Sequence, residues 1–215
     1  MHSKKAIIFD FDYTLGDSSK GIHDSINYAL TKLGFQTVSY EKTCEAIGKS
    51  LPDTLVHFTG EENRDRSDDF YKYFMEKAMD VMVQKCIIYP DVEKTLEYLR
   101  SKNLKLAIAS TKHRHRITAI LSKFSLLDYF SVIVGGEDVS VHKPDPMVLF
   151  HVFAHLGIDS KDCIYVGDNI VDAQAAERAK VDFIPVLTGL TSLKEFKQYP
   201  RSAVICSLSE LMKLL

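Results

Sequence analysis

Short runs of consecutive apolar residues alternate with segments of helical period along most of the chain. The first run spans residues 4–11 and is apolar at consecutive positions, as in a strand buried on both faces. Similar runs recur at residues 104–110, 130–134, 163–166, 183–187 and 203–206. Between most of them, apolar residues recur at helical spacing, as at Val92, Leu96 and Leu99. The alternation predicts an α/β fold with three layers, a Rossmann-like, doubly wound parallel sheet covered by helices on both faces.

The alternation is interrupted after the first strand. Apolar residues at helical spacing, among them Ile22, Ile26 and Leu30, lead up to Gly34, which is a typical helix stop. Further helical patterns follow, and none of the segments up to residue 86 has a strand pattern. We therefore expect a core domain formed by residues 1–16 and 87–215, with a helical domain of residues 17–86 inserted into it.

Composition and charge exclude several classes of protein. The 215 residues are 46% hydrophobic and 26% charged, which is ordinary for a globular chain. With 27 Lys and Arg against 29 Asp and Glu, the chain has no general basic field, so we expect no nucleic-acid partner. The apolar runs are far shorter than the ~20 residues that span a bilayer, and the N-terminus lacks the pattern of a signal peptide. We expect no membrane association.

The cysteines and histidines are scattered along the chain. Cys44, Cys86, Cys163 and Cys206 form no C-x-x-C pair, which favours free thiols in a reducing, cytoplasmic environment over disulfides or zinc ligands. The eight histidines likewise show no spacing typical of a metal site. From these residue types we expect no metal cluster.

Carboxylates follow two of the predicted strands. Asp10 and Asp12 end the first strand, and Asp168 follows the run at residues 163–166, with Asp172 one helical turn later. Alone, such residues also serve as helix caps. Because the carboxyl ends of parallel strands meet at one edge of the sheet, however, these carboxylates converge there. Oxygen-rich sites of this kind suit Mg²⁺, so the pattern predicts a magnesium site.

Two other strand ends add groups that complement an anion. Ser110 and Thr111 follow the run at residues 104–110 and precede a predicted helix, whose N-terminus favours an anion. Lys143 stands in a loop that Pro144 and Pro146 stiffen. Each of these residues alone is more often a helix cap or a solvated charge, and only their combination with the carboxylates points to a phosphate site.

The order and spacing of these motifs resemble the haloacid dehalogenase superfamily of phosphatases. The first motif is Asp10-Phe11-Asp12-Tyr13-Thr14, and the others are Ser110, Lys143, and Gly167-Asp168 with Asp172. The insertion resembles the helical cap of the phosphoglycolate phosphatase and β-phosphoglucomutase branch. Residues 16–18 match that branch after the first motif, and residues 46–51 resemble its cap loop.

The resemblance implies a role for each motif residue. Asp10 is the implied nucleophile, which forms an aspartyl-phosphate. Asp12 would protonate the leaving oxygen and then deprotonate the attacking water. Ser110, Thr111 and neighbouring amides would hold phosphate oxygens, and Lys143 would bind both the phosphate and the nucleophile.

The resemblance also implies a Mg²⁺ site. The metal would be held by the Asp10 carboxylate, the backbone carbonyl of Asp12, and Asp168, with Asp172 supporting that shell. Dehalogenases of the superfamily lack the second aspartate of the first motif. Because this chain keeps Asp12, a phosphatase is favoured over a dehalogenase.

Several positions depart from the family or are left open by it. The family most often has glycine where this chain has Tyr13, which would be strained if the turn requires a positive φ. Residues 112–116 are unusually basic for a helix start, and a solvated face is favoured there over a surface that steers an anionic substrate. In the cap loop, Gly48 and Lys49 are candidates for substrate selection.

The resemblance predicts a Mg²⁺-dependent phosphatase acting on a small phosphorylated metabolite. Phosphoglycolate, pyrophosphate, sugar phosphates and nucleoside monophosphates all remain open as substrates. The alternative is a phosphomutase of the β-phosphoglucomutase type. A non-catalytic phospho-receiver is less favoured, because receivers are about half this length and have no helical insertion. A nucleotide-binding module is also less favoured, since the chain has neither G-x-G-x-x-G nor G-x-x-x-x-G-K-[ST].

Overall fold

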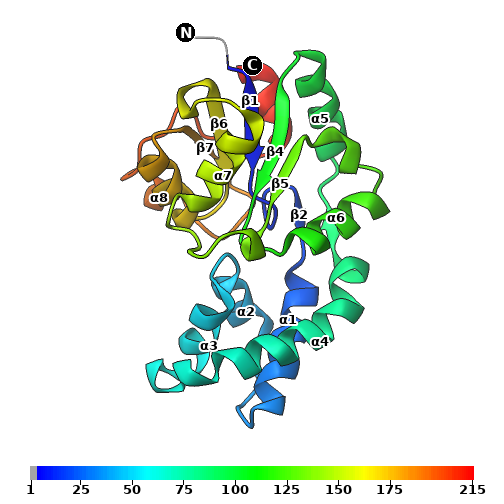
Figure 1. Ribbon diagram of the computed structural model, residues 1–215, viewed down its shortest axis with the longest axis vertical. Helices are drawn as coiled ribbons and strands as arrows, with labels where there is room; N and C mark the ends of the chain where they lie inside the picture. The colour runs from blue at the N-terminus through cyan, green and yellow to red at the C-terminus, as the bar shows by residue number, and fades with distance from the viewer. Residues whose placement is uncertain (1–3) are drawn as a thin grey trace. The chain divides into compact units, whose positions relative to one another are not determined.

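The computed structural model describes residues 4–215, which form two compact units. One unit comprises the described residues up to Gly16 together with Ile88–Leu215, and the other is Asp17–Ile87. The chain passes between them through two short strands, β2 (Gly16–Asp17) and β3 (Ile87–Ile88), which pair as a two-stranded sheet. Figure 1 shows the elements of each unit.

A five-stranded parallel sheet forms the centre of the larger unit. Its strands follow the order β5-β4-β1-β6-β7, so the order reverses at β1. The strands are β1 (Ala6–Phe9), β4 (Lys105–Ala109), β5 (Val132–Val134), β6 (Cys163–Gly167) and β7 (Asp182–Pro185). The reversal is the topological switch point at which doubly wound sheets bind ligands, and the predicted α/β fold is confirmed.

The prediction of a sixth strand at residues 203–206 is wrong. This run forms an isolated bridge between Ile205 and Val186. The Ile205 amide donates to the Pro185 carbonyl at 3.0 Å, and the Ile205 carbonyl accepts from the Leu187 amide at 2.9 Å. The run is apolar because Ile205 is buried beside the end of β7, and that contact is too short to extend into a strand.

Helices cover both faces of the sheet and make three layers (Figure 1). On one face, α7 (Met147–Leu156) and α8 (Ile170–Ala179) form a core with Ala6 and Ile8, which are alternate residues of β1. On the other face, α5 (Val92–Ser101) packs on β4 and α6 (Arg114–Lys123) on β5, and α10 (Leu211–Leu214) packs on α5. The short helix α9 (Leu193–Phe196) follows β7 and adds Phe196 to the first core.

The smaller unit is built from four helices around its own core. They are α1 (Ser19–Lys32), α2 (Tyr40–Ala46), α3 (Leu51–Thr59) and α4 (Ser67–Lys85). Its buried side chains include Ile26 and Leu30 of α1, Leu55 of α3, and Phe70 and Phe74 of α4. The first helix ends before Gly34, whose φ of 80° is the left-handed conformation expected of a helix stop.

Short 3₁₀ segments connect several of these elements. They are η1 (Glu61–Arg66), η2 (Leu127–Tyr129), η3 (Gly136–Asp138), η4 (Ser160–Asp162) and η5 (Leu208–Glu210). Across residues 4–215, no helix has the length and apolar character that crossing a membrane requires.

Candidate active site

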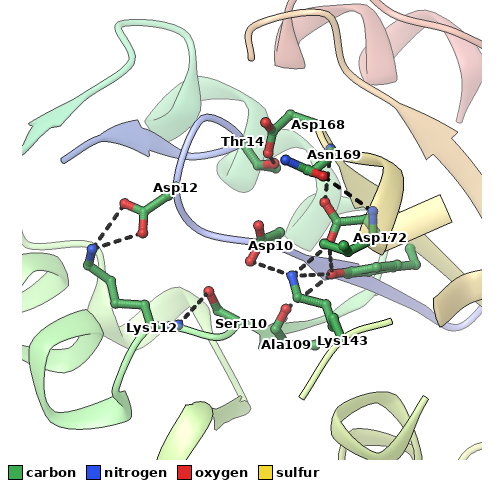
Figure 2. A network of polar contacts seen from close by, with 12 residues as sticks. Asp10, Asp12, Thr14, Ala109, Ser110, Lys112, Lys143, Asp168, Asn169 and Asp172 are labelled. Atoms are coloured by element: carbon green, nitrogen blue, oxygen red, sulfur yellow. Dashed lines mark hydrogen bonds and ion pairs between the residues drawn. The ribbon is translucent and has the colours of Figure 1, made fainter. Parts of the chain in front are cut away.

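The carboxyl ends of β1, β4 and β6 lie side by side and bring three polar residues together. Asp10 follows β1, and its amide donates to the Val166 carbonyl of β6 at 2.9 Å. Ser110 follows β4, and Asp168 follows β6. All three side chains are buried. Figure 2 shows how they lie around one point. The structure therefore places the first, second and fourth predicted motifs at one edge of the sheet.

Lys143 connects two of the carboxylates from inside the protein. Its Nζ lies 3.0 Å from Asp10 Oδ1 and 2.6 Å from Asp172 Oδ1, and its side chain is 1% exposed (Figure 2). It also donates to the Tyr165 hydroxyl at 3.1 Å. Burial lowers the pKa of the Lys143 ammonium, but Asp10 and Asp172 raise it by a larger amount. The pKa therefore lies above its ordinary value, and the group stays charged. The third motif thus supplies a fixed positive charge beside Asp10.

Tyr165 is a member of this network that the sequence did not indicate. Its hydroxyl donates to Asp172 Oδ1 at 2.7 Å, and the Ala109 carbonyl lies 3.2 Å away. Burial and the carboxylates around it raise its pKa well above the ordinary value, so the phenol keeps its proton. In the sequence this residue stands within an apolar strand. Its only signal is its place on the strand that leads into Asp168.

Asp172 is held on both of its oxygens by protein donors. Oδ1 accepts from Lys143 and Tyr165, and Oδ2 accepts from the Asn169 amide at 3.0 Å in the capping box that starts α8. A Cβ added to Gly167 would lie 2.6 Å from Asp172 Oδ2, so glycine makes this close approach possible. These hydrogen bonds connect Asp172 to Lys143, to Tyr165 and to the start of α8.

Asp168 is supported by two residues of separate loops. The Thr14 hydroxyl donates to Asp168 Oδ1 at 3.3 Å. A Cβ added to Gly189 would lie 2.0 Å from Asp168 Oδ2, so a larger residue in this loop after β7 would displace the Asp168 side chain. The sequence analysis missed Gly189. Its position after a fifth parallel strand is the signal that could have found it.

The charges at this site are unbalanced. Asp10, Asp168 and Asp172 each offer an oxygen within 4.8 Å of the others, and Lys143 supplies one positive charge against them. Burial raises the pKa of Asp10, where Lys143 opposes the shift and Asp172 adds to it. Burial and the other two carboxylates raise the pKa of Asp168 well above its ordinary value. The buried oxygens and excess negative charge fit a hard divalent cation such as Mg²⁺.

Asp12 is oriented differently from the other three carboxylates. Its oxygens accept from Lys112 Nζ at 3.0 and 2.9 Å, apart from the group around Asp10 (Figure 2). The Lys112 side chain is 3% exposed, and its Nζ lies over the Phe11 ring, 5.6 Å from the centroid. The expectation of a solvated basic face is therefore wrong for Lys112, and also for Arg116, which is buried. The ion pair with Asp12 explains why Lys112 is buried.

Tyr13 has the left-handed backbone conformation that glycine adopts most readily. Its φ is 59°, and the turn places the Leu15 amide 2.9 Å from the Phe11 carbonyl. The Thr188 hydroxyl donates to the Tyr13 carbonyl. The turn therefore requires a positive φ at this position, and the backbone strain expected for Tyr13 in that case is present.

The remaining predicted residues lie in two places. Thr111 is half-buried after β4, and its carbonyl lies so close to Gly136 that a Cβ there would be 2.4 Å away. Gly48 and Lys49 belong to the helical unit, where Gly48 has a φ of 95° and Lys49 is exposed. The structure thus brings together the core motifs and leaves the loop of Gly48 and Lys49 in the other unit.

The structure brings two histidines and a carboxylate together that the spacing along the sequence did not indicate. His113 and His115 lie with Glu137, and each of the three offers a ligand atom within 4.8 Å of the other two. Sequence spacing hides this group, because Glu137 follows the next strand along the chain.

Comparison with known proteins agrees with the motifs. Residues 7–186 match the family model of haloacid dehalogenase-like hydrolases. The phosphoglycolate phosphatase of Nitrosospira multiformis is 30% identical over 219 residues, covering 98% of this chain and 95% of its own length. That of Psychrobacter arcticus is 29% identical over 203 residues, covering 91% of this chain and 88% of its own length.

Solved structures give the same result. A protein from Bacteroides fragilis, described as a haloacid dehalogenase-like hydrolase, superimposes with a TM-score of 0.93 at 35% identity, covering 97% of this chain and 100% of its own. A predicted phosphatase from Clostridium acetobutylicum gives a TM-score of 0.91 at 25% identity, covering 99% and 98%. With its motifs, sheet order and family match in agreement, the chain belongs to the haloacid dehalogenase-like hydrolases.

Proposed function

We propose that this protein is a Mg²⁺-dependent phosphatase that hydrolyses a small phosphorylated metabolite through an aspartyl-phosphate. The observation that carries the proposal is the buried Asp10, held 3.0 Å from Lys143 at the switch point of the sheet. The phosphoglycolate phosphatases among its relatives support this reaction class. Phosphoglycolate-like acids, pyrophosphate, sugar phosphates and nucleoside monophosphates are the candidate substrates.

Asp10 supplies the nucleophile in this proposal. A carboxylate oxygen of Asp10 attacks the phosphorus, and the bond from phosphorus to the leaving oxygen breaks. Lys143 fixes the attacking carboxylate and offsets negative charge on the phosphoryl oxygens. Ser110, with Thr111 at the start of α6, provides the hydroxyl and amide donors for those oxygens.

Asp12 moves the protons. It gives a proton to the leaving oxygen in the first step. As a carboxylate it then takes a proton from the water that attacks the aspartyl-phosphate, which releases inorganic phosphate and restores Asp10. The two hydrogen bonds from Lys112 hold the Asp12 carboxylate between these steps. Lys112 is therefore a positioning residue.

Asp10, Asp168 and the backbone carbonyl of Asp12 would hold the Mg²⁺ ion, with Asp172 supporting the shell through Lys143. The ion would neutralise charge shared by the substrate phosphate and the carboxylates. Thr14 and Gly189 keep Asp168 in place for this role.

The helical unit would act as a cap that selects the substrate. Gly48, with its positive φ, gives the loop a tight turn, and the exposed Lys49 follows it. Its ammonium would contact the leaving group or a second anionic group of the substrate. The free cysteines, among which Cys86 and Cys163 are buried, support a cytoplasmic enzyme.

Phosphate release from a panel of phosphomonoesters and pyrophosphate tests the proposal. Wild type and Asp10→Asn are assayed in parallel, each with Mg²⁺ and with EDTA. We expect release that requires Mg²⁺ and disappears in Asp10→Asn. Folded wild-type protein that releases no phosphate from any substrate would contradict the phosphatase proposal. The next assay is then phosphate transfer between sugar phosphates, which would identify a phosphomutase.

A further inference from the structure

A second group of potential metal ligands lies at the start of α6, apart from the carboxylates around Asp10. His113 precedes the helix, His115 is its second residue, and Glu137 belongs to η3 after β5. His115 Nδ1 lies 3.6 Å from Glu137 Oε1, and His113 Nδ1 lies 4.0 Å from Glu137 Oε2. The proposed phosphatase reaction uses none of these three side chains.

These separations match metal ligands better than hydrogen bonds. A nitrogen and an oxygen 3.6 or 4.0 Å apart are beyond hydrogen-bond distance. Bonds of about 2.0–2.1 Å in a tetrahedral site put two ligand atoms roughly 3.3–3.4 Å apart. Small side-chain rotations of His113 and His115 would close the remaining difference. Their rings are nearly perpendicular, at 86°, with centroids 5.5 Å apart, so they can approach one point from different sides.

Glu137 is held in place before any metal binds. The Arg114 amide donates to Oε2 at 2.8 Å and the His115 amide to Oε1 at 3.4 Å. A Cβ added to Gly135 would lie 2.2 Å from the Arg114 nitrogen and 2.7 Å from Glu137 Oε2, so glycine lets the two segments meet. The Arg114 guanidinium also forms an ion pair with Asp138 at 3.1 Å, so its positive charge is partly balanced there. The carboxylate therefore has little freedom left to lose on binding.

We propose that His113, His115 and Glu137 form a second cation site, which takes a transition metal such as Zn²⁺ and leaves a position for water. Two imidazoles and one carboxylate suit Zn²⁺, Co²⁺ or Ni²⁺, whereas the all-oxygen set at Asp10 suits Mg²⁺. Side-chain exposures of 15%, 56% and 29% for the three residues leave the site open to solvent. The two sites therefore differ in the metal that they select.

Metal titration in the presence of excess Mg²⁺ tests this proposal. Zn²⁺ binding is followed by calorimetry, and Co²⁺ binding by its visible absorption, with the full chain. We expect one Zn²⁺ per chain that Mg²⁺ does not displace. His115→Gln and Glu137→Gln should each weaken Zn²⁺ binding by at least about tenfold. His155→Gln, which changes an exposed histidine of α7, is the matched control and should bind Zn²⁺ as wild type does.

A further variant separates the two sites. Asp168→Asn should lose Mg²⁺ binding and keep the Zn²⁺ site, because Asp168 is not part of the histidine group. Zn²⁺ affinity that is unchanged in His115→Gln, or lost in Asp168→Asn, would overturn the proposal and assign the bound Zn²⁺ elsewhere. His115 and Glu137 are partly exposed, so both variants are expected to fold, which circular dichroism checks.

Discussion

Lys112 donates to both carboxylate oxygens of Asp12, at 2.9 and 3.0 Å, from a side chain that is almost fully buried. The carboxylate that we assign to proton transfer is therefore fixed by a charged partner one hundred residues away in the chain. Losing this partner should leave Asp12 less well positioned.

Lys112→Gln should lower kcat roughly tenfold to a hundredfold, a part of the range that general acid–base catalysis contributes. If Lys112 acts through Asp12, adding Lys112→Gln to Asp12→Asn should lower kcat little further. Steady-state kinetics of the two single variants and the double variant measure both effects. Lys161→Gln, which changes an exposed lysine of the same unit, serves as the control. Losses of kcat that multiply in the double variant would argue against a role through Asp12.

Asp168→Asn should stabilise the metal-free protein. The substitution removes one of three buried carboxylates that repel one another, and the pKa of Asp168 is already raised by burial and by the other two. In EDTA we expect a higher Tm than for wild type, and in Mg²⁺ we expect no further rise. Thermal unfolding in both buffers measures this. A variant that is less stable than wild type in EDTA would contradict it.

The metal-free protein should lose stability as pH rises. The pKa of Asp168 is higher in the folded chain than its ordinary value of 3.8, so the folded state binds more protons between the two values. Its contribution to stability is fully present below the ordinary value and disappears as pH rises through the raised one. Tm measured across pH in EDTA should fall for wild type more than for Asp168→Asn. Equal slopes for the two proteins would count against this assignment.

Gly189→Ala should weaken Mg²⁺ binding by about tenfold to a hundredfold, the range seen when support for a ligand is disturbed. The added methyl would overlap Asp168 Oδ2 and force that side chain to move. Gly157→Ala is the matched control, since it meets no atom within 4 Å but has a φ of 65°. It should cost stability and leave Mg²⁺ affinity unchanged. Calorimetric titration with Mg²⁺ distinguishes the two, and unchanged affinity in Gly189→Ala would refute the prediction.

Tyr13→Gly should change the free energy of unfolding by less than about 1 kcal/mol. Relief of the left-handed conformation, worth about 1–2 kcal/mol, is offset by the greater freedom of glycine in the unfolded chain. Tyr13→Val keeps the strain and adds a β-branched side chain, so it should lose about 1 kcal/mol or more. Urea unfolding compares the three proteins. A valine variant as stable as wild type would show that the turn relaxes to another conformation.

The sequence was sufficient to predict what the sheet itself determines. Buried strands followed by Asp10, Ser110 and Asp168 had to bring these residues to one edge, because parallel strands share their carboxyl ends. The third motif also lies at this edge, because Lys143 forms ion pairs with Asp10 and Asp172.

Contacts between side chains of distant loops could not be predicted in this way. In the sequence, Lys112 belongs to a basic segment typical of a surface, and only the structure shows its ion pair with Asp12. Tyr165 likewise stands in an apolar strand, and only the structure shows its hydrogen bond to Asp172. The pairing of His115 with Glu137 depends on how the loop after β5 turns, which no periodicity encodes. The apolar run at residues 203–206 led to a wrong strand prediction. Ile205 is apolar because it is buried, but it forms only an isolated bridge with Val186.

The order of the strands also has a consequence for biosynthesis. Asp10 is made well before its neighbour Asp168 and the glycine that accommodates it, Gly189. Before β6 is made, a chain on the ribosome contains Asp10 but not Asp168, the carboxylate that lies near it. The repulsion between the two carboxylates therefore arises only after β1, β4 and β5 have been synthesised, so three strands of the sheet are available before the carboxylates meet.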